Sequence, residues 1–124
     1  MLAHVSIQCA NFQESAAFYD AVLAPLDGGR IMEDGSSAIG YGIPPVATFW
    51  IGEQRTGTGF RETHLAFKAT TRAAVRGFFE AATSRGAEIL YEPKLWPQYD
   101  PLYFAAFVRD PDGNNVEAVC LAPE

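Results

Sequence analysis

Apolar and polar side chains alternate at the start of the chain, over residues 2–9. The apolar positions are Val5, Ile7 and Cys9, and the polar positions between them are His4, Ser6 and Gln8. A two-residue period is the pattern of a β-strand with one apolar face. We therefore predict a first strand over residues 2–9, with both His4 and Ser6 on its polar face.

The period then changes to that of a helix. Asn11 followed by Glu14 has the spacing of a capping box, and Phe18, Val22 and Leu26 recur at helical intervals. The Gly and Pro residues near position 28 end the pattern. We predict a helix over 15–26, followed by short strands at 30–33, 38–41 and 46–51, which Gly and Pro residues separate.

The second half of the chain repeats this order of elements. It predicts a strand over 62–68, a helix over 71–85 and strands at 87–91, 103–109 and 115–121. A single offset of 60 residues carries His4 onto His64 and Phe18 onto Phe78. We therefore predict an α+β fold: one domain made of two βαβββ modules, at about 1–52 and 61–124, joined by a polar linker at 53–60.

Composition narrows the classes of partner. The chain has 124 residues, 48% of them hydrophobic and 19% charged, which suits one globular domain. Its net charge of −6 and its lack of a basic cluster argue against nucleic acid and against anionic membranes. A small-molecule ligand or a protein partner remains. We see no secretion signal, so we expect a cytoplasmic protein with both cysteines reduced and buried.

The two histidines are the whole histidine content, and they occupy equivalent positions of the repeat. A lone strand histidine is more often structural, but this pairing favours a shared site, and neutral imidazole is the commonest metal ligand. In the last predicted strand, Glu117 faces away from the apolar row. A Glu between Val and Ala either faces water on an edge strand or is paired with a cation. His4, His64 and Glu117 thus form a two-histidine, one-carboxylate set that suits a divalent Zn, Ni, Mn, Fe or Co ion.

The paired modules, the histidine in the first strand of each, and the closing segment 107–117 resemble the vicinal oxygen chelate superfamily. This superfamily includes glyoxalases, bleomycin-resistance proteins and extradiol dioxygenases. The resemblance covers essentially the whole chain. It implies a cupped mixed β-sheet with helices on the outer face, a divalent metal ion in the cup and a homodimer. It also implies that His4, His64 and Glu117 match three of the four ligand positions.

The fourth ligand position departs from the family pattern. Glyoxalase I has a Glu in the fourth strand, whereas the predicted strand here presents Thr48 and Trp50 to the cleft. Neither side chain replaces a carboxylate as both ligand and base. The missing third histidine and the few basic residues also leave the dioxygenase and thiol-transferase patterns incomplete. No branch of the family fits fully.

The segment 93–104 is rich in aromatic and proline residues and forms either a wall of the cleft or a buried connector at a dimer interface. We single out Trp96, Tyr99 and Tyr103 as substrate-binding residues, with Tyr41 as a further candidate proton donor. Arg109 is a candidate for an anionic ligand, although a surface ion pair is the commoner role of an Arg.

The sequence thus favours a metal-dependent enzyme of the lyase, isomerase, thiol-transferase or dioxygenase type, acting on a small substrate with adjacent oxygens. In this interpretation Glu117 and Tyr103 are catalytic, and Thr48, Trp50, Trp96, Tyr99, Tyr103 and Arg109 bind substrate. The first alternative is a non-catalytic protein that binds an aromatic drug or metabolite. The second is a module that a metal merely stabilises.

Overall fold

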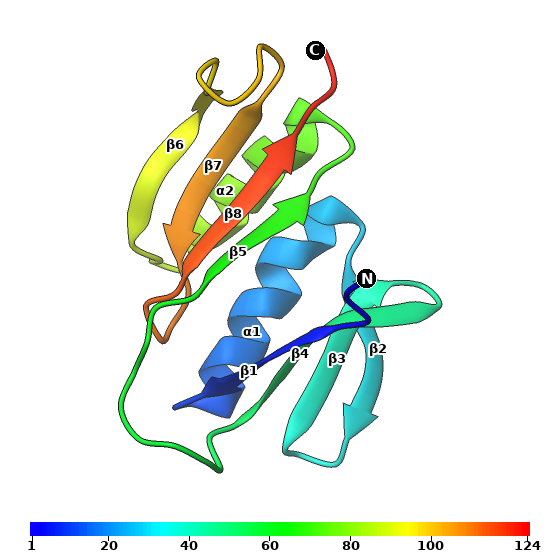
Figure 1. Ribbon diagram of the computed structural model, residues 1–124, viewed down its shortest axis with the longest axis vertical. Helices are drawn as coiled ribbons and strands as arrows, with labels where there is room; N and C mark the ends of the chain where they lie inside the picture. Colours follow the sequence, from blue (N-terminus) through cyan, green and yellow to red (C-terminus); the bar gives the residue numbers. More distant parts are fainter.

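A computed structural model describes all residues, 1–124 (Figure 1). Two helices and eight strands follow in the order expected for two βαβββ units. The elements are β1 (Val5–Cys9), α1 (Phe12–Leu23), a 3₁₀ turn (Ala24–Leu26), β2 (Gly29–Asp34), β3 (Ala38–Ile43), β4 (Val46–Glu53), β5 (His64–Lys68), α2 (Arg72–Ser84), β6 (Ile89–Leu95), β7 (Phe104–Arg109) and β8 (Asn115–Cys120). No helix is both long and apolar enough to cross a membrane.

The strands form two four-stranded mixed sheets, ordered β1-β4-β3-β2 and β5-β8-β7-β6. In each sheet the first strand pairs in parallel with the last strand of its module, and the other pairs are antiparallel. The two helices lie against each other and cover the same side of the two sheets (Figure 1). The predicted fold of two βαβββ modules is confirmed.

The core lies between the helices and the sheets. The apolar rows predicted for the strands face it, and Ile51, Val116 and Ala118 are fully buried. In α2 the buried stripe includes Val75 and Phe78, whereas the predicted Phe79 is only half-buried. Because alternating strand residues face opposite sides, the polar rows lie on the sheet faces away from the helices.

Several element boundaries differ from the prediction. Helix α1 begins at Phe12 because the Asn11 side chain accepts a hydrogen bond from the Glu14 N–H, so the cap itself fixes the start. His4 precedes β1 and is exposed. Strand β6 extends to Leu95 and so includes part of the proline-rich segment. Pro93 is tolerated there because β6 is an edge strand, where the missing N–H of a proline need not remove a hydrogen bond to a neighbouring strand.

The turn between β7 and β8 fastens the second module to the first. Asp110 is buried and accepts a 2.7 Å hydrogen bond from the hydroxyl of Tyr19 in α1. Asp112 accepts hydrogen bonds from the Ala10 N–H and the Ser15 hydroxyl. The closing segment that carried the family resemblance therefore acts here as a clamp between modules.

Candidate functional site

Glu117 is the acid that β8 places at the centre of the second sheet. Strand β8 lies between β5 and β7, and Ala66 and Phe107 are the cross-strand partners of Glu117. The residue is only 2% exposed. The alternative of an edge-strand Glu facing water is therefore wrong, because β8 is an interior strand.

Two side chains from different elements hold the Glu117 carboxylate. The Tyr103 hydroxyl donates a 2.5 Å hydrogen bond to Oε1, and His64 Nε2 lies 3.0 Å from Oε2. His64 begins β5, and its side chain is half exposed. Of the predicted site residues, these three are the ones the structure brings into direct contact.

This carboxylate has no Lys or Arg partner within the chain. Its one ion-pairing partner is His64, and no Lys or Arg reaches it. A buried carboxylate is costly unless it is paired or binds a cation. Asn115, the cross-strand partner of His64, also carries a buried Oδ1 atom without a hydrogen-bond partner. The Glu117 carboxylate thus lacks a Lys or Arg partner, and the amide oxygen of Asn115, two residues earlier in β8, lacks a hydrogen-bond donor.

Tyr103 is held in its neutral form. Burial, the hydrogen bond to Glu117 and the nearby negative charge together raise its pKa to about 12. The hydroxyl therefore keeps its proton at neutral pH and acts as a hydrogen-bond donor.

Aromatic rings line the space beside the carboxylate. A cavity of about 280 Å³ is formed by His64, Tyr99, Tyr103, Phe107 and Glu117. The rings of His64 and Phe107 are nearly parallel, 6.1 Å apart, and Tyr99 packs against Tyr103 with ring centroids 5.2 Å apart. Tyr99 and Tyr103 of the aromatic segment therefore lie on the same face of the sheet as Glu117.

Trp96 forms the outer part of this wall. Its ring packs edge-on against Phe107 at 5.2 Å, and its indole N–H donates to the carbonyl of Ala105. The ammonium of Lys94 lies 4.2 Å from the Trp96 ring centroid. A fixed positive charge therefore stands beside the aromatic wall.

Phe107 is a site residue that sequence reasoning missed. It lies opposite Glu117 in the β7–β8 ladder, and its ring is packed between those of His64 and Trp96. The alternation of strand residues could have placed Phe107 on the face of the sheet away from the helices, because its neighbours Ala106 and Val108 face the helices. This signal was hidden because every residue of that strand from Phe104 to Val108 is apolar.

His4 does not join His64 and Glu117 in the same chain. No group of three or more His, Cys, Asp or Glu side chains is arranged to hold a metal ion. His4 precedes β1 in the first sheet, whereas the pair lies in the second sheet. A single chain therefore supplies two of the three predicted ligands in one place.

Trp50 lies on the face of the first sheet that is turned away from α1, as predicted. It pairs across the ladder with Gly40, and a Cβ atom on that glycine would come within 2.6 Å of the indole ring. The ring therefore lies over Gly40. Thr48 is exposed beside a small apolar cavity of about 170 Å³ that also includes Phe67 and Lys68 of β5. Neither residue contacts the Glu117 cavity.

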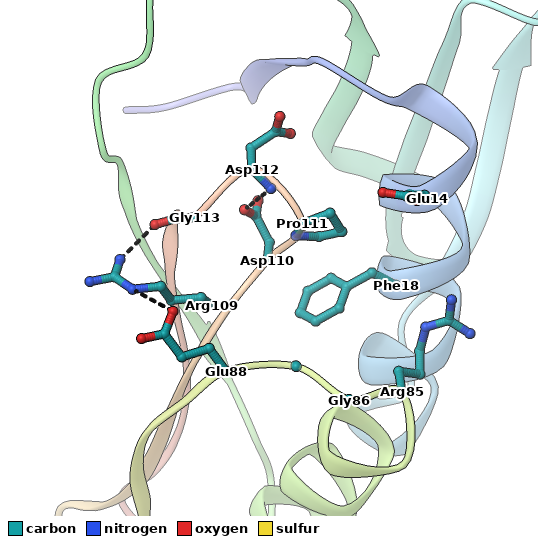
Figure 2. A pocket seen from close by; sticks show the side chains of 11 residues that line it. Glu14, Phe18, Arg85, Gly86, Glu88, Arg109, Asp110, Pro111, Asp112 and Gly113 are labelled. Carbon is teal, nitrogen blue, oxygen red and sulfur yellow. Dashed lines mark hydrogen bonds and ion pairs between the residues drawn. The ribbon is translucent and has the colours of Figure 1, made fainter.

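Arg109 borders a different cavity, of about 500 Å³, on another part of the molecule (Figure 2). Figure 2 shows Phe18 and Glu14 projecting from α1 toward the turn that follows Arg109. The Arg109 guanidinium pairs with Glu62 and Glu88 and donates to the Gly113 carbonyl. Its charge is already compensated, which corresponds to the ion-pair alternative for this residue.

Comparison with known proteins identifies the family of this chain. Residues 1–118 match the family model of the Glyoxalase/Bleomycin resistance protein/Dioxygenase superfamily. A glyoxalase/bleomycin resistance protein from Albidiferax ferrireducens T118 is 27% identical, with a TM-score of 0.82 over 94% of this chain and 96% of that one. None of the curated proteins compared with this chain matches it.

Two further solved structures share the fold. A lactoylglutathione lyase from Agrobacterium tumefaciens is 15% identical, with a TM-score of 0.68 over 94% of this chain and 90% of that one. A domain from Frankia sp. EAN1pec is 20% identical, with a TM-score of 0.70 over 94% of each chain. With the family match extending over residues 1–118, the chain belongs to the Glyoxalase/Bleomycin resistance protein/Dioxygenase superfamily.

Proposed function

We propose that this protein is a divalent-metal-dependent enzyme of the glyoxalase type that acts on a small substrate with adjacent oxygens. The observation that carries the proposal is the state of Glu117, a carboxylate that is 2% exposed and has no Lys or Arg partner. Buried charges in proteins are paired or coordinate metals. A metal ion held by Glu117 and His64 would supply the missing positive charge.

The spacing of the two donor atoms fits this assignment. His64 Nε2 and Glu117 Oε2 are 3.0 Å apart. An imidazole nitrogen and a carboxylate oxygen are both ligands that divalent first-row metal ions accept. The pair can therefore accept a metal ion with little rearrangement, provided that His64 is neutral.

The third ligand would come from a second copy of the chain. His4 is exposed and distant from the pair in its own chain, so its imidazole is free to reach a neighbour. We propose a homodimer in which His4 of the partner subunit completes each site. This arrangement would set the first sheet of one chain, with Trp50, opposite the second sheet of the other.

The chain's own residues would then have distinct roles. A bound metal ion would act as a Lewis acid on the substrate oxygens. Tyr103, which keeps its proton, would hold Glu117 in orientation through its hydroxyl. Glu117 could move a proton at its carboxylate, and the rings of Tyr99 and Phe107 would keep water out. Because Thr48 and Trp50 replace a second acid, a mechanism with two carboxylates is not available.

One observation favours a second function, the binding of an aromatic ligand without catalysis. Phe107, Trp96, Tyr99 and Tyr103 form a continuous aromatic surface around the cavity. Such surfaces offer large contact areas to planar ligands. In this alternative, metal-free protein would bind planar aromatic compounds tightly and show no metal-dependent turnover.

The test is the metal content of the purified protein and of two variants, His64→Ala and His4→Ala. We expect about one equivalent per chain in the parent and loss of the metal in both variants. Tyr99→Phe is the matched control, because the Tyr99 hydroxyl makes no hydrogen bond in the structure, and it should retain metal. Metal retained in His64→Ala, or absent from the reconstituted parent, would refute the metalloenzyme assignment.

Heterodimers test the shared site directly. A dimer of one His4→Ala chain and one His64→Ala chain would contain one complete site and one site lacking both histidines. Purified heterodimers should therefore recover half of the parental metal content. Failure of this recovery, with metal still bound by the parent, would show that the site is built within one chain.

A further inference from the structure

The linker between β4 and β5 carries an unusual run of unpaired hydrogen-bond donors. Residues 54–63 cross from the first sheet to the second without forming a helix or strand (Figure 1). The N–H groups of residues 57–62 donate no hydrogen bond to any protein atom. The N–H groups on either side, those of Thr56 and Thr63, are bonded to Gln8 and Asn114. The segment 57–62, whose N–H groups have no acceptor in the protein, is therefore anchored by hydrogen bonds at both ends.

Two glycines of this run have a positive φ angle, a feature that anion-binding nests share. Gly57 has a φ of +73° and Gly59 a φ of +76°, with Thr58 between them. Turns in which left-handed residues alternate with ordinary ones direct successive N–H groups toward a common point, and such concavities bind phosphate and other oxyanions. A β-carbon at either position would strain the backbone, so glycine is required for this shape.

The linker borders a cavity of about 390 Å³, which lies between it and β1. The lining includes Arg61, the hydroxyl-bearing Thr58 and the amide of Gln54. None of these three side chains has a hydrogen-bond partner in the chain, and Arg61 forms no ion pair. The other arginine of the linker, Arg55, is also exposed and unpaired but does not line the cavity.

The acidic side chains around the cavity already have hydrogen-bond or ion-pair partners within the chain. Asp112 lines one wall, where its two oxygens accept hydrogen bonds from the Ala10 N–H and the Ser15 hydroxyl. Glu62, next to Arg61, is paired with Arg109. The free donors and the free guanidinium are therefore the unsatisfied groups of this cavity.

We propose that this cavity binds the phosphate group of a small ligand, with the backbone N–H groups of 57–60 and the guanidinium of Arg61 as its donors. The tetrahedral oxyanion would accept several N–H bonds at once, and Arg61 would supply the charge-assisted contact. The ligand is either free phosphate or a phosphate monoester. Ser6, which lies two residues from His4 along the chain, lines the same cavity.

The test is a titration of the isotope-labelled protein with inorganic phosphate and, separately, with glycerol 3-phosphate. A chelator is present, so the result does not depend on any metal. We expect saturable amide shifts confined to residues 56–62. Tighter binding of the monoester would identify the organic phosphate as the ligand, and equal binding would identify free phosphate. Acetate at the same ionic strength should not reproduce the shifts.

Arg61→Gln and Arg55→Gln form a matched pair, because both arginines are exposed, belong to the same linker and carry the same charge. We expect Arg61→Gln to weaken phosphate binding about tenfold, as for the loss of one charge-assisted hydrogen bond, and Arg55→Gln to leave it nearly unchanged. Equal losses in both variants would show a general charge effect and overturn the proposal. Shifts that do not saturate, or that centre on other residues, would overturn it as well.

Discussion

Tyr103 donates a 2.5 Å hydrogen bond to Glu117, and this contact joins the aromatic segment before β7 to the buried acid of β8. Without it, one oxygen of a carboxylate that is 2% exposed would lose its only donor. The contact also depends on protonated Tyr103, whose pKa is raised to about 12 by burial and by Glu117. The contact therefore holds the acid in one orientation across the neutral pH range.

Replacing Tyr103 by Phe should leave Oε1 of Glu117 without a hydrogen-bond donor and so destabilise the protein. We expect the free energy of unfolding to fall by about 1–3 kcal/mol, because a buried acceptor then lacks a partner. Urea denaturation measures this change. Tyr99→Phe is the control, because it removes a hydroxyl from the same wall without breaking a hydrogen bond. Equal stability of the two variants would show that the Tyr103 contact contributes nothing.

Asp110→Ala should loosen the clamp between the modules. The carboxylate accepts hydrogen bonds from Tyr19, from the side chain and N–H of Asn114 and from the N–H of Asp112. Leaving these groups without an acceptor should cost about 3 kcal/mol or more in urea denaturation. Asp34→Ala, an exposed acid without side-chain hydrogen bonds, should change stability little. An equally small decrease in the free energy of unfolding for Asp110→Ala and Asp34→Ala would show that the hydrogen bonds of Asp110 do not hold the modules together.

Gly40→Ala should displace the ring of Trp50, because the added carbon would lie 2.6 Å from it. In a background in which Trp96 is replaced by Phe, we expect a shift in the emission of Trp50 and a loss of stability. Gly29→Ala is the control, since it lies in the same sheet and its Cβ would meet nothing within 4 Å. An unchanged Trp50 spectrum in Gly40→Ala would contradict the placement of the indole over this glycine.

Acid should weaken the fold partly through Asp20. The hydrogen bonds from Arg30 lower the pKa of this carboxyl below its usual value, and the Tyr41 hydroxyl contributes in the same direction. A lowered folded-state pKa stabilises the protein above the unfolded value of about 3.9, and that stability is lost as pH falls toward the folded value.

Arg30→Gln provides the measurement for Asp20. The variant should be less stable than the parent at pH 7, and its free energy of unfolding should fall less steeply between pH 5 and pH 3. Chemical denaturation at a series of pH values gives both slopes. If the free energy of unfolding falls equally steeply with pH in parent and variant, the contact between Arg30 and Asp20 does not contribute to the loss of stability in acid.

Local patterns in the sequence determined the elements and the faces of the strands. The alternation around Glu117 placed it opposite the row of Val116 and Ala118, and the structure confirms this because the strand period of two is set by the backbone itself. The repeat offset of 60 residues predicted two βαβββ modules, which is also confirmed. Both features can be predicted from sequence, because each depends either on residues close together in the chain or on a regular spacing between equivalent residues.

Contacts between distant segments were decided only by the tertiary structure. Sequence placed His4, His64 and Glu117 in one set, but the way the modules pack brings only the last two together in one chain. Phe107 lies in the site because its register in β7 places it opposite Glu117, and the Tyr103 hydroxyl reaches Glu117 from the residue just before β7. Likewise, only the tertiary structure shows that the N–H groups of residues 57–62 have no acceptor within the protein. Such relationships depend on packing across the whole chain, which no local period encodes.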